Sequence, residues 1–317
     1  MKFLFLFLLV IMNCLKKPNV FFTKIITPER MVDIFKKLEV TLPGKVGLKI
    51  HSGEPGGLYF LKPDFLHKIY EYTKGTFLEC NTAYTSERSN SEKHKNLLKQ
   101  HGWYDKGRTI DLMDENPDAD IKFYILNHTM INTTYAGSHL QLYDSCVVLS
   151  HFKGHKMGGF GGALKQLSIG FASQRGKTWI HSAGRELNWT KGFGKTPQEE
   201  FTKAMADSAS VIVDYFKSKG EIVFINVLAN ISSSCDCAGK RVPEPKIKDI
   251  GILASTDPVA IDTASLDLIK ETNDEGTYEL LSQIQDLLGE NTIDTAEKLG
   301  VGSREYNLIN IDDDDYN

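Results

Sequence analysis

Short apolar runs that alternate with amphipathic helices are the feature that most constrains the fold of this chain. Residues 146–149 (CVVL) and 221–228 (EIVFINVL) lack the polar alternation of a half-exposed strand, which is typical of strands buried on both faces. Residues 201–216 repeat apolar side chains at the spacing of one helix face. The sequence therefore predicts an α/β fold, with a mainly parallel sheet flanked by helices in a single large domain.

The other predicted elements fit this alternation. Thr27 before Pro28 and Asp257 before Pro258 predict helix starts, because a short polar side chain can accept hydrogen bonds from the free N–H groups of the first turn. Further helices are predicted at residues 63–72, 91–100 and 278–288. Further strands are predicted at residues 45–50, 76–80, 110–113, 121–126 and 249–254.

The composition excludes several classes of protein. Of 317 residues, 41% are hydrophobic and 25% are charged, which argues against a disordered chain and against many membrane spans. The net charge of −4 gives no reason to expect a nucleic-acid partner. We divide the chain into a leader (residues 1–17), one α/β domain (residues 18–311) and an acidic tail (residues 312–317) that is expected to be solvated.

The leader resembles an export signal. Residues 3–12 are apolar throughout, but this run is too short to span a bilayer as a helix. Cys14 behind it is typical of a bacterial lipoprotein, although Asn13 stands where a small residue is usual. In that case the protein is exported or lipid-anchored, and it meets the membrane only through the leader or its lipid. The alternative is translation from Met12, which gives a cytoplasmic product.

Polar and glycine-bearing segments follow the predicted strands. Ligands of open α/β sheets bind beyond the carboxyl ends of the strands. If the strands are parallel, these segments share one edge of the sheet, where we expect the functional site. They cover residues 51–57, 81–88, 150–162, 234–237 and 255–258.

Residues 151–162 (HFKGHKMGGFGG) form the segment best suited to an anion. Its glycines let the backbone approach a ligand closely and turn N–H groups toward it. Lys153 and Lys165 add positive charge, and a helix that begins near Ala163 would add its partial charge. These features fit a phosphate or a carboxylate. The alternative is that the glycines only permit a tight turn between strand and helix. The glycines concerned are Gly158, Gly159, Gly161 and Gly162.

Two other segments supply further candidates for ligand binding. Glu54 lies in a tight turn between glycines, where an isolated carboxylate often contacts a ligand. Arg88 is either an anion contact or a surface charge. The candidates from these segments are Gly53, Glu54, Gly56, Gly57, Asn81 and Arg88.

Three histidines can move protons or bind a metal near the same edge. A histidine can serve as general acid or base near neutral pH, or it can hold zinc or iron beside a thiolate. The alternative is that these rings only form hydrogen bonds with loop backbone. The candidates for catalysis are His151, Lys153, His155 and His181.

Cys235 and Cys237 are separated by one residue, so their thiolates can share a soft metal. A disulfide across so short a loop would be strained, and the alternative is a pair of structural thiols. Cys80 and Cys146 lie in predicted strands and are expected to be buried. The chain has five cysteines, too few for two ferredoxin-type clusters, and no self-contained four-cysteine cluster is expected. The candidate metal ligands are Cys235, Cys237, His151 and His155.

Several motifs together resemble the family called domain of unknown function 362. They include SGEPGG (residues 52–57), ECNTAY (79–84), the glycine-rich segment with its flanks (149–173), CDC (235–237) and DIGILASTDPVAID (249–262). The resemblance implies a single α/β domain of a mainly bacterial and archaeal family. Many members carry a ferredoxin module with C-x-x-C runs. The corresponding interval, residues 183–200, contains no cysteine, so the cluster is not transferred to this chain.

Two classes of function follow from these motifs, since the resemblance brings no activity with it. The first is an enzyme, redox-linked or metal-assisted, that acts on a small anion and uses a divalent metal such as zinc or iron. The second is a non-catalytic module that binds a cofactor or transfers electrons beside a separate ferredoxin.

Overall fold

The computed structural model describes residues 17–116, 119–192 and 194–312 of the chain. The predicted leader, except Lys17, and the acidic tail beyond Asp312 lie outside the described residues. Asp312 itself is not merely solvated, because its carboxylate accepts hydrogen bonds from the Thr23 hydroxyl and the Lys24 N–H and pairs with Arg30 at 2.8 Å.

An eight-stranded, mainly parallel sheet runs through the molecule, as predicted. From β10 to β4 all neighbouring strands are parallel, whereas β11 is antiparallel to both β10 and β1. The strand order is β12 (Asn307–Asn310), β1 (Asn19–Thr23), β11 (Gly251–Ser255), β10 (Ile222–Leu228), β7 (Ser145–His151), β2 (Val46–Lys49), β3 (Thr76–Glu79) and β4 (Ile110–Leu112).

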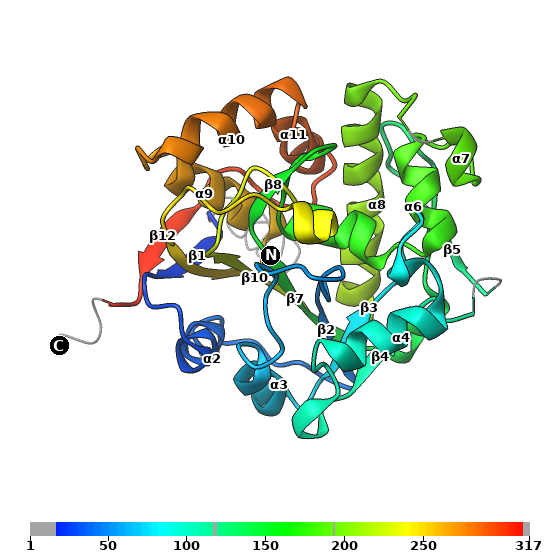
Figure 1. The fold of residues 1–317 in the computed structure, drawn as a ribbon. Helices are drawn as coiled ribbons and strands as arrows, with labels where there is room; N and C mark the ends of the chain where they lie inside the picture. The colour runs from blue at the N-terminus through cyan, green and yellow to red at the C-terminus, as the bar shows by residue number, and fades with distance from the viewer. Residues whose placement is uncertain (1–16, 117–118, 193, 313–317) are drawn as a thin grey trace, which may run out of the picture.

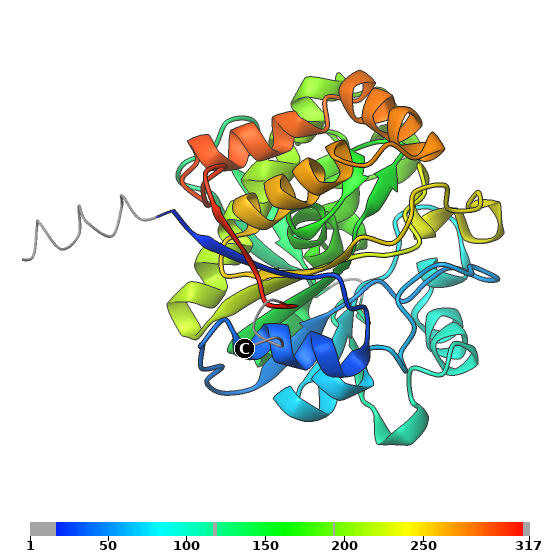
Figure 2. The same ribbon diagram turned by 90° about the vertical axis from the view of Figure 1, so that its left-hand side faces the viewer.

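Helices cover both faces of the sheet (Figure 1), and the two helix layers lie above and below the strands in the turned view (Figure 2). One face packs against α8 (Gln198–Lys219), α9 (Pro258–Lys270), α10 (Glu275–Asp286) and α11 (Glu290–Lys298). The other face packs against α2 (Pro28–Lys36), α3 (His67–Thr73) and α4 (Ser91–Gln100). Among the described residues, no helix is both long and apolar enough to cross a membrane.

The central strands are apolar on both faces because each face has its own core. In β7, Cys146 and Val148 belong to the core beneath α8 and α9, whereas Val147 and Leu149 belong to the core on the opposite face. Cys80 and Cys146 are buried thiols, as predicted.

The predicted helix starts are confirmed. The Thr27 hydroxyl accepts a hydrogen bond from the Arg30 N–H at 3.1 Å, and the Asp257 carboxylate accepts from Val259 and Ala260 at 2.9 Å. One placement was wrong. Because β11 is antiparallel, residues 255–258 lie at the edge of the sheet opposite the other glycine-bearing and polar segments.

Two hairpins were not predicted. Residues 121–126, expected as a strand, form β5 (Ile121–Tyr124), which pairs with β6 (Thr133–Ala136) outside the main sheet. The glycine-rich segment is not an open loop, since β8 (Lys153–His155) pairs antiparallel with β9 (Gly159–Gly161). A short helix, α5 (Ala163–Lys165), then leads into a π-helical turn and α6 (Gln174–His181).

The N–H groups at the start of α5 are already bound by a carboxylate of the chain itself. The buried Asp262 carboxylate, from α9, accepts hydrogen bonds from the Ala163 N–H at 2.8 Å and the Leu164 N–H at 2.9 Å. The Asn226 amide donates a third bond to it at 2.8 Å. A side chain at Gly162 would collide with this carboxylate, so the glycine permits the contact.

We expect Asp262→Asn to destabilise the fold. An asparagine offers one oxygen to two backbone donors and turns an amide toward the Asn226 amide. The buried N–H left without an acceptor costs about 1–3 kcal/mol of unfolding free energy. Urea unfolding followed by circular dichroism measures this loss, and Glu271→Gln, at the exposed end of α9, is the control. Equal midpoints for the two variants would contradict the assigned role of Asp262.

Candidate metal centre

The carboxyl ends of four parallel strands meet at one edge of the sheet. β10, β7, β2 and β3 are neighbours and run in the same direction. The segments that follow them are therefore brought together as predicted, and the segment after β11 is the one that is not.

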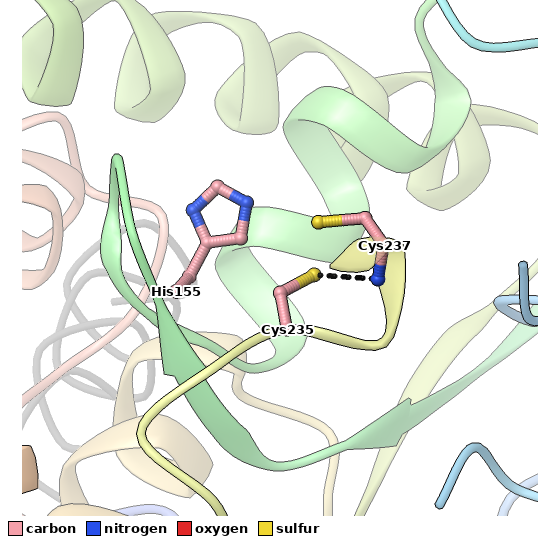
Figure 3. A group of neighbouring side chains, drawn as sticks. All are labelled: His155, Cys235 and Cys237. Atoms are coloured by element: carbon pink, nitrogen blue, oxygen red, sulfur yellow. Dashed lines mark hydrogen bonds between the residues drawn. The ribbon is translucent and has the colours of Figure 1, made fainter. Parts of the chain in front are cut away.

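His155, Cys235 and Cys237 form a compact group at this edge. One donor atom from each, a ring nitrogen or a sulfur, lies within 4.8 Å of the other two. His155 and Cys235 are buried, and Cys237 is partly exposed. The imidazole and both thiol groups face the same small space (Figure 3). Nitrogen and sulfur donors in this arrangement can hold zinc or iron.

A close backbone approach places the histidine beside the thiols. The Gly154 N–H, in β8, donates to the Ser232 carbonyl at 2.8 Å, in the loop that follows β10. A side chain at Gly154 would collide with the backbone of Ser233. Glycine at this position therefore lets the hairpin that carries His155 lie against the segment that carries Cys235.

The hydrogen bonds of His155 determine which ring nitrogen carries its proton. Its Nδ1 atom accepts from the Gly158 N–H at 2.9 Å and the Met157 N–H at 3.3 Å. The proton of the neutral ring is therefore on Nε2, the nitrogen that faces the thiols in Figure 3. Burial, with the nearby Lys165 charge, lowers the pKa of His155, so the ring stays neutral.

Cys235 is the acceptor of the group. Its sulfur accepts from the Cys237 N–H at 3.3 Å, and the Cys237 thiol and the His155 ring lie beside it. The Cys237 thiol, aided by His155 and Lys165, holds the pKa of Cys235 well below its usual value although burial opposes this. The interaction with Cys235, together with burial, raises the pKa of Cys237. Cys235 is thus the thiolate and Cys237 the thiol of the pair.

Asp236, between the two cysteines, fixes the position of this segment through buried ion pairs. Its buried carboxylate lies 2.9 Å from the Lys153 ammonium and 2.9 Å from His151 Nδ1. Burial acts to raise the pKa of Asp236, but His151 and Lys153 together hold it well below the usual value. Sequence reasoning missed this role. The signal was present, since a charged residue inside a thiol pair must find a partner if the segment is buried.

His151 and Lys153 are therefore engaged with Asp236 and not with the thiols. The second ring nitrogen of His151, Nε2, lies 2.7 Å from the Ala229 carbonyl oxygen. Because both nitrogens face oxygen acceptors, neither offers a lone pair to a metal. The structure thus does not support His151 as a metal ligand, and it gives His151 and Lys153 the role of positioning Asp236.

His181 and Lys165 border the group. The His181 ring stacks on Phe201 with centroids 4.7 Å apart and meets the Trp189 ring edge-on at 5.4 Å. Burial lowers the pKa of His181 well below its usual value, and the neighbouring His155 ring and Lys165 ammonium group act in the same direction. Lys165 is half-buried, and no hydrogen bond or ion pair within the described residues engages its ammonium group.

Most of the glycines that were predicted to contact a ligand instead contact other parts of the chain. The Gly158 N–H donates to His155, Gly159 packs against the backbone of Gly289, and Gly162 makes room for Asp262. Gly161 differs, since the space beside its Cα borders the side chains of Lys153 and Lys165. The turn with Gly53, Gly56 and Gly57 packs close to residues 239–240 and Phe60, just beyond the cysteine pair.

Arg88 is not a surface charge, because its side chain is buried between two carboxylates. Its buried guanidinium group donates to Glu54 at 3.1 Å and to Glu79 at 2.9 Å. Glu54 also accepts from the Tyr84 hydroxyl at 2.7 Å. Glu54 and Arg88, both predicted to contact a ligand, thus form an ion pair with each other.

The third predicted contact, Asn81, is also occupied. Its side-chain oxygen accepts from His94 Nδ1 at 3.0 Å, and its amide donates to Ser91 at 2.9 Å. Two histidines beside Arg88 were not predicted. Burial, with the nearby Arg88 charge, lowers the pKa of His51 to about 3 and that of His94 to about 2.

We expect these two histidines to make the protein sensitive to acid. Both resist protonation in the native state, whereas unfolded histidines titrate near pH 6.5. Stability therefore falls as the pH drops below about 6.5, by about 2 kcal/mol for each ring at pH 5. Urea unfolding at pH 7 and pH 5 measures the loss. His94→Gln should reduce it, and His128→Gln, an exposed ring, should not. An unchanged loss in His94→Gln would contradict this origin.

Two solved structures are similar to the chain at low identity. A protein from Thermotoga maritima, determined by the Northeast Structural Genomics Consortium, is 12% identical with a TM-score of 0.45, over 86% of this chain and 58% of its own. The lactate racemase apoprotein from Thermoanaerobacterium thermosaccharolyticum is 14% identical with a TM-score of 0.43, over 79% of this chain and 57% of its own. This chain thus spans less than two thirds of either. No curated protein sequence matches it significantly.

The family comparison agrees with the motifs of the sequence. The model of the family described as "Domain of unknown function (DUF362)" matches residues 46–267, more than half of the chain. That interval contains the His155 hairpin and the Cys235–Cys237 segment. The chain belongs to the domain of unknown function 362 family.

Proposed function

We propose that this protein is an enzyme that binds a soft divalent metal, zinc or iron, through Cys235, Cys237 and His155 and acts on a small anion. The observation that carries the proposal is the cluster of three donor atoms within 4.8 Å of one another. Three protein ligands leave a tetrahedral metal one position for a substrate, which is the usual arrangement of a catalytic site.

The two thiols are the stronger ligands of this site. Metal ligation requires a deprotonated Cys237 beside the Cys235 thiolate, so loading releases the thiol proton. Ligation by His155 Nε2 also moves the ring proton to Nδ1, where the Gly158 and Met157 N–H groups now donate. The hairpin turn at residues 156–158 must therefore adjust as the metal binds. This cost makes His155 the weakest of the three ligands.

His181 supplies a group for proton transfer. Its ring is buried and stays neutral, and His155 and the charged Lys165 lie near it. A neutral imidazole at this position can accept a proton from a substrate bound to the metal.

We expect the ligand variants to lose metal in a graded way. Cys235→Ser and Cys237→Ser should each weaken cobalt(II) binding by more than about a hundredfold, beyond what loss of an outer partner costs. His155→Ala should have a smaller effect, for the reason given above. The thiolate-to-cobalt charge-transfer band and metal analysis of anaerobically purified protein measure binding. Cys146→Ala, which removes a buried thiol of β7, is the matched control, and equal metal content in all variants would refute the site.

A second function, an electron-transfer module that works beside a separate ferredoxin or another redox partner, is favoured by the polarised thiol pair. The Cys235 sulfur accepts from the Cys237 N–H, and the neighbouring Cys237 thiol, His155 and Lys165 lower the pKa of Cys235. This thiolate can attack a partner disulfide, form a mixed disulfide and expel one partner thiolate. Attack by the Cys237 sulfur then closes the Cys235–Cys237 disulfide, and the second partner sulfur leaves with the Cys237 thiol proton, which transfers two electrons in all.

Intact-mass measurement separates the two functions. Treatment of metal-free protein with oxidised glutathione should remove two hydrogens from a redox module and none from its Cys237→Ser variant. The short loop between the thiols disfavours this disulfide, so we expect the metal enzyme to keep both thiols reduced. Ready closure of the disulfide, together with failure to bind cobalt, would favour the electron-transfer module.

A further inference from the structure

We propose that the surface beside Cys237 docks an acidic protein. We call it the basic surface and define it by Lys62, Lys240, Arg241 and the exposed Leu58. The inference goes beyond both functions proposed above and does not depend on a bound metal, because it concerns how a partner would reach the edge of the sheet where the candidate centre lies.

Two loops that pack against each other build the basic surface. The first is the turn after β2, at residues 53–62, and the second begins with the short helix η5 (Asp236–Arg241), yellow in Figure 1, which contains Cys237. A Cβ atom at Gly57 would lie 3.7 Å from the Gly239 Cα atom, and one at Gly239 would lie 3.1 Å from the Pro55 carbonyl oxygen. Because both positions lack a side chain, the turn lies directly against the segment with the cysteines.

Two lysine side chains flank this turn. A side chain at Gly56 would collide with the carbon chain of Lys240, so this carbon chain lies across the turn. The Lys62 ammonium group donates to the Gly57 carbonyl at 3.4 Å and lies 3.5 Å from the centre of the Phe60 ring. The glycine-bearing turn, which was predicted to contact a ligand, thus carries both lysines on one small area of surface.

The three cations of the basic surface have no acidic partner. Lys62, Lys240 and Arg241 are exposed. In the part of the chain that the structure describes, no carboxylate forms an ion pair with any of them. Their charges are therefore available to a partner with acidic side chains, which they would attract during its approach.

The acidic side chains near these loops offset little of this charge. Glu54 is buried in its ion pair with Arg88, and Asp64 pairs with Arg108 at 2.9 Å. Glu244 is exposed and has no ion pair among the described residues. Three positive charges are thus opposed by one exposed carboxylate.

An exposed apolar side chain favours a protein over a nucleic acid as the partner. Leu58, in the same turn, is 68% exposed, and Tyr59 beside it is half-buried. Protein interfaces combine apolar contacts with a polar rim, whereas a nucleic-acid interface relies on many phosphate contacts, for which three cations are few. Since Cys237 is itself partly exposed, a protein docked here would lie beside the candidate metal centre.

The test uses the full-length protein and two acidic polypeptides of equal charge, poly-L-glutamate and a copolymer of glutamate and tyrosine. We expect both to bind at low ionic strength, the copolymer more tightly, and salt to weaken both. Lys62→Glu, Lys240→Glu and Arg241→Glu together should weaken binding at least about tenfold. Leu58→Ser should abolish the preference for the copolymer. Fluorescence anisotropy of the labelled polypeptides measures the affinities.

A matched control and a footprint locate the binding. Lys45→Glu, Lys217→Glu and Lys298→Glu reverse three exposed cations outside the basic surface and should leave the affinities unchanged. Hydrogen exchange in the presence of poly-L-glutamate should slow at residues 55–62 and 236–246. If circular dichroism shows that the triple variant of the basic surface does not fold, Lys62→Gln with Lys240→Gln replaces it, with a smaller loss expected.

Several outcomes overturn the inference. Equal losses in the basic-surface and control variants, an unchanged affinity in the replacement variant, or no slowed exchange in the two loops would show that the acidic polypeptide binds elsewhere. A copolymer that binds no more tightly than poly-L-glutamate, or tighter binding of polyuridylate of equal charge, would rule out a protein partner. None of these results depends on cobalt binding, so the proposed metal site stands or fails separately.

Discussion

The parallel pairing of β7 with β10 is the constraint on which the candidate site depends. β7 leads into the hairpin with His155, and β10 leads into the loop with Cys235 and Cys237. The two strands run side by side and end at the same edge, with His151 opposite Val227. His155 and Cys235, eighty positions apart in the chain, are therefore brought close together at this edge. The same geometry explains why residues after the antiparallel β11 take no part.

Buried carboxylates then hold the loops in place. Asp236 pairs with Lys153 and His151, and Glu79 pairs with Lys49 and Arg88. Asp262 accepts hydrogen bonds from the first N–H groups of α5. A buried charge is costly unless it is paired and hydrogen-bonded, and each of these groups is both. Such contacts favour one arrangement of the loops over others. They also consume most of the charges that would otherwise be free to bind a ligand.

This distribution of charge determines the electrostatics of the candidate site. Histidines beside Arg88 and around the cysteines are kept neutral by burial, and the thiol pair carries one negative charge. A metal that replaces the thiol proton would alter this balance. Binding of a metal and binding of an anion are therefore expected to depend on each other, as charges in a low-dielectric interior do.

The sequence alone determined the fold class, the edge of the sheet where the candidate site lies and the Cys235–Cys237 pair as candidate metal ligands. These follow from local patterns, since apolar runs identify buried strands and polar segments after them mark the ligand edge. Tertiary structure decided which neighbours each side chain received. It placed His155 with the thiols, assigned His151 to Asp236 and enclosed Arg88 between two carboxylates. Spacing along the chain does not contain this information, because partners such as Asp262 and Glu79 come from elements distant in sequence and compete for the same donors.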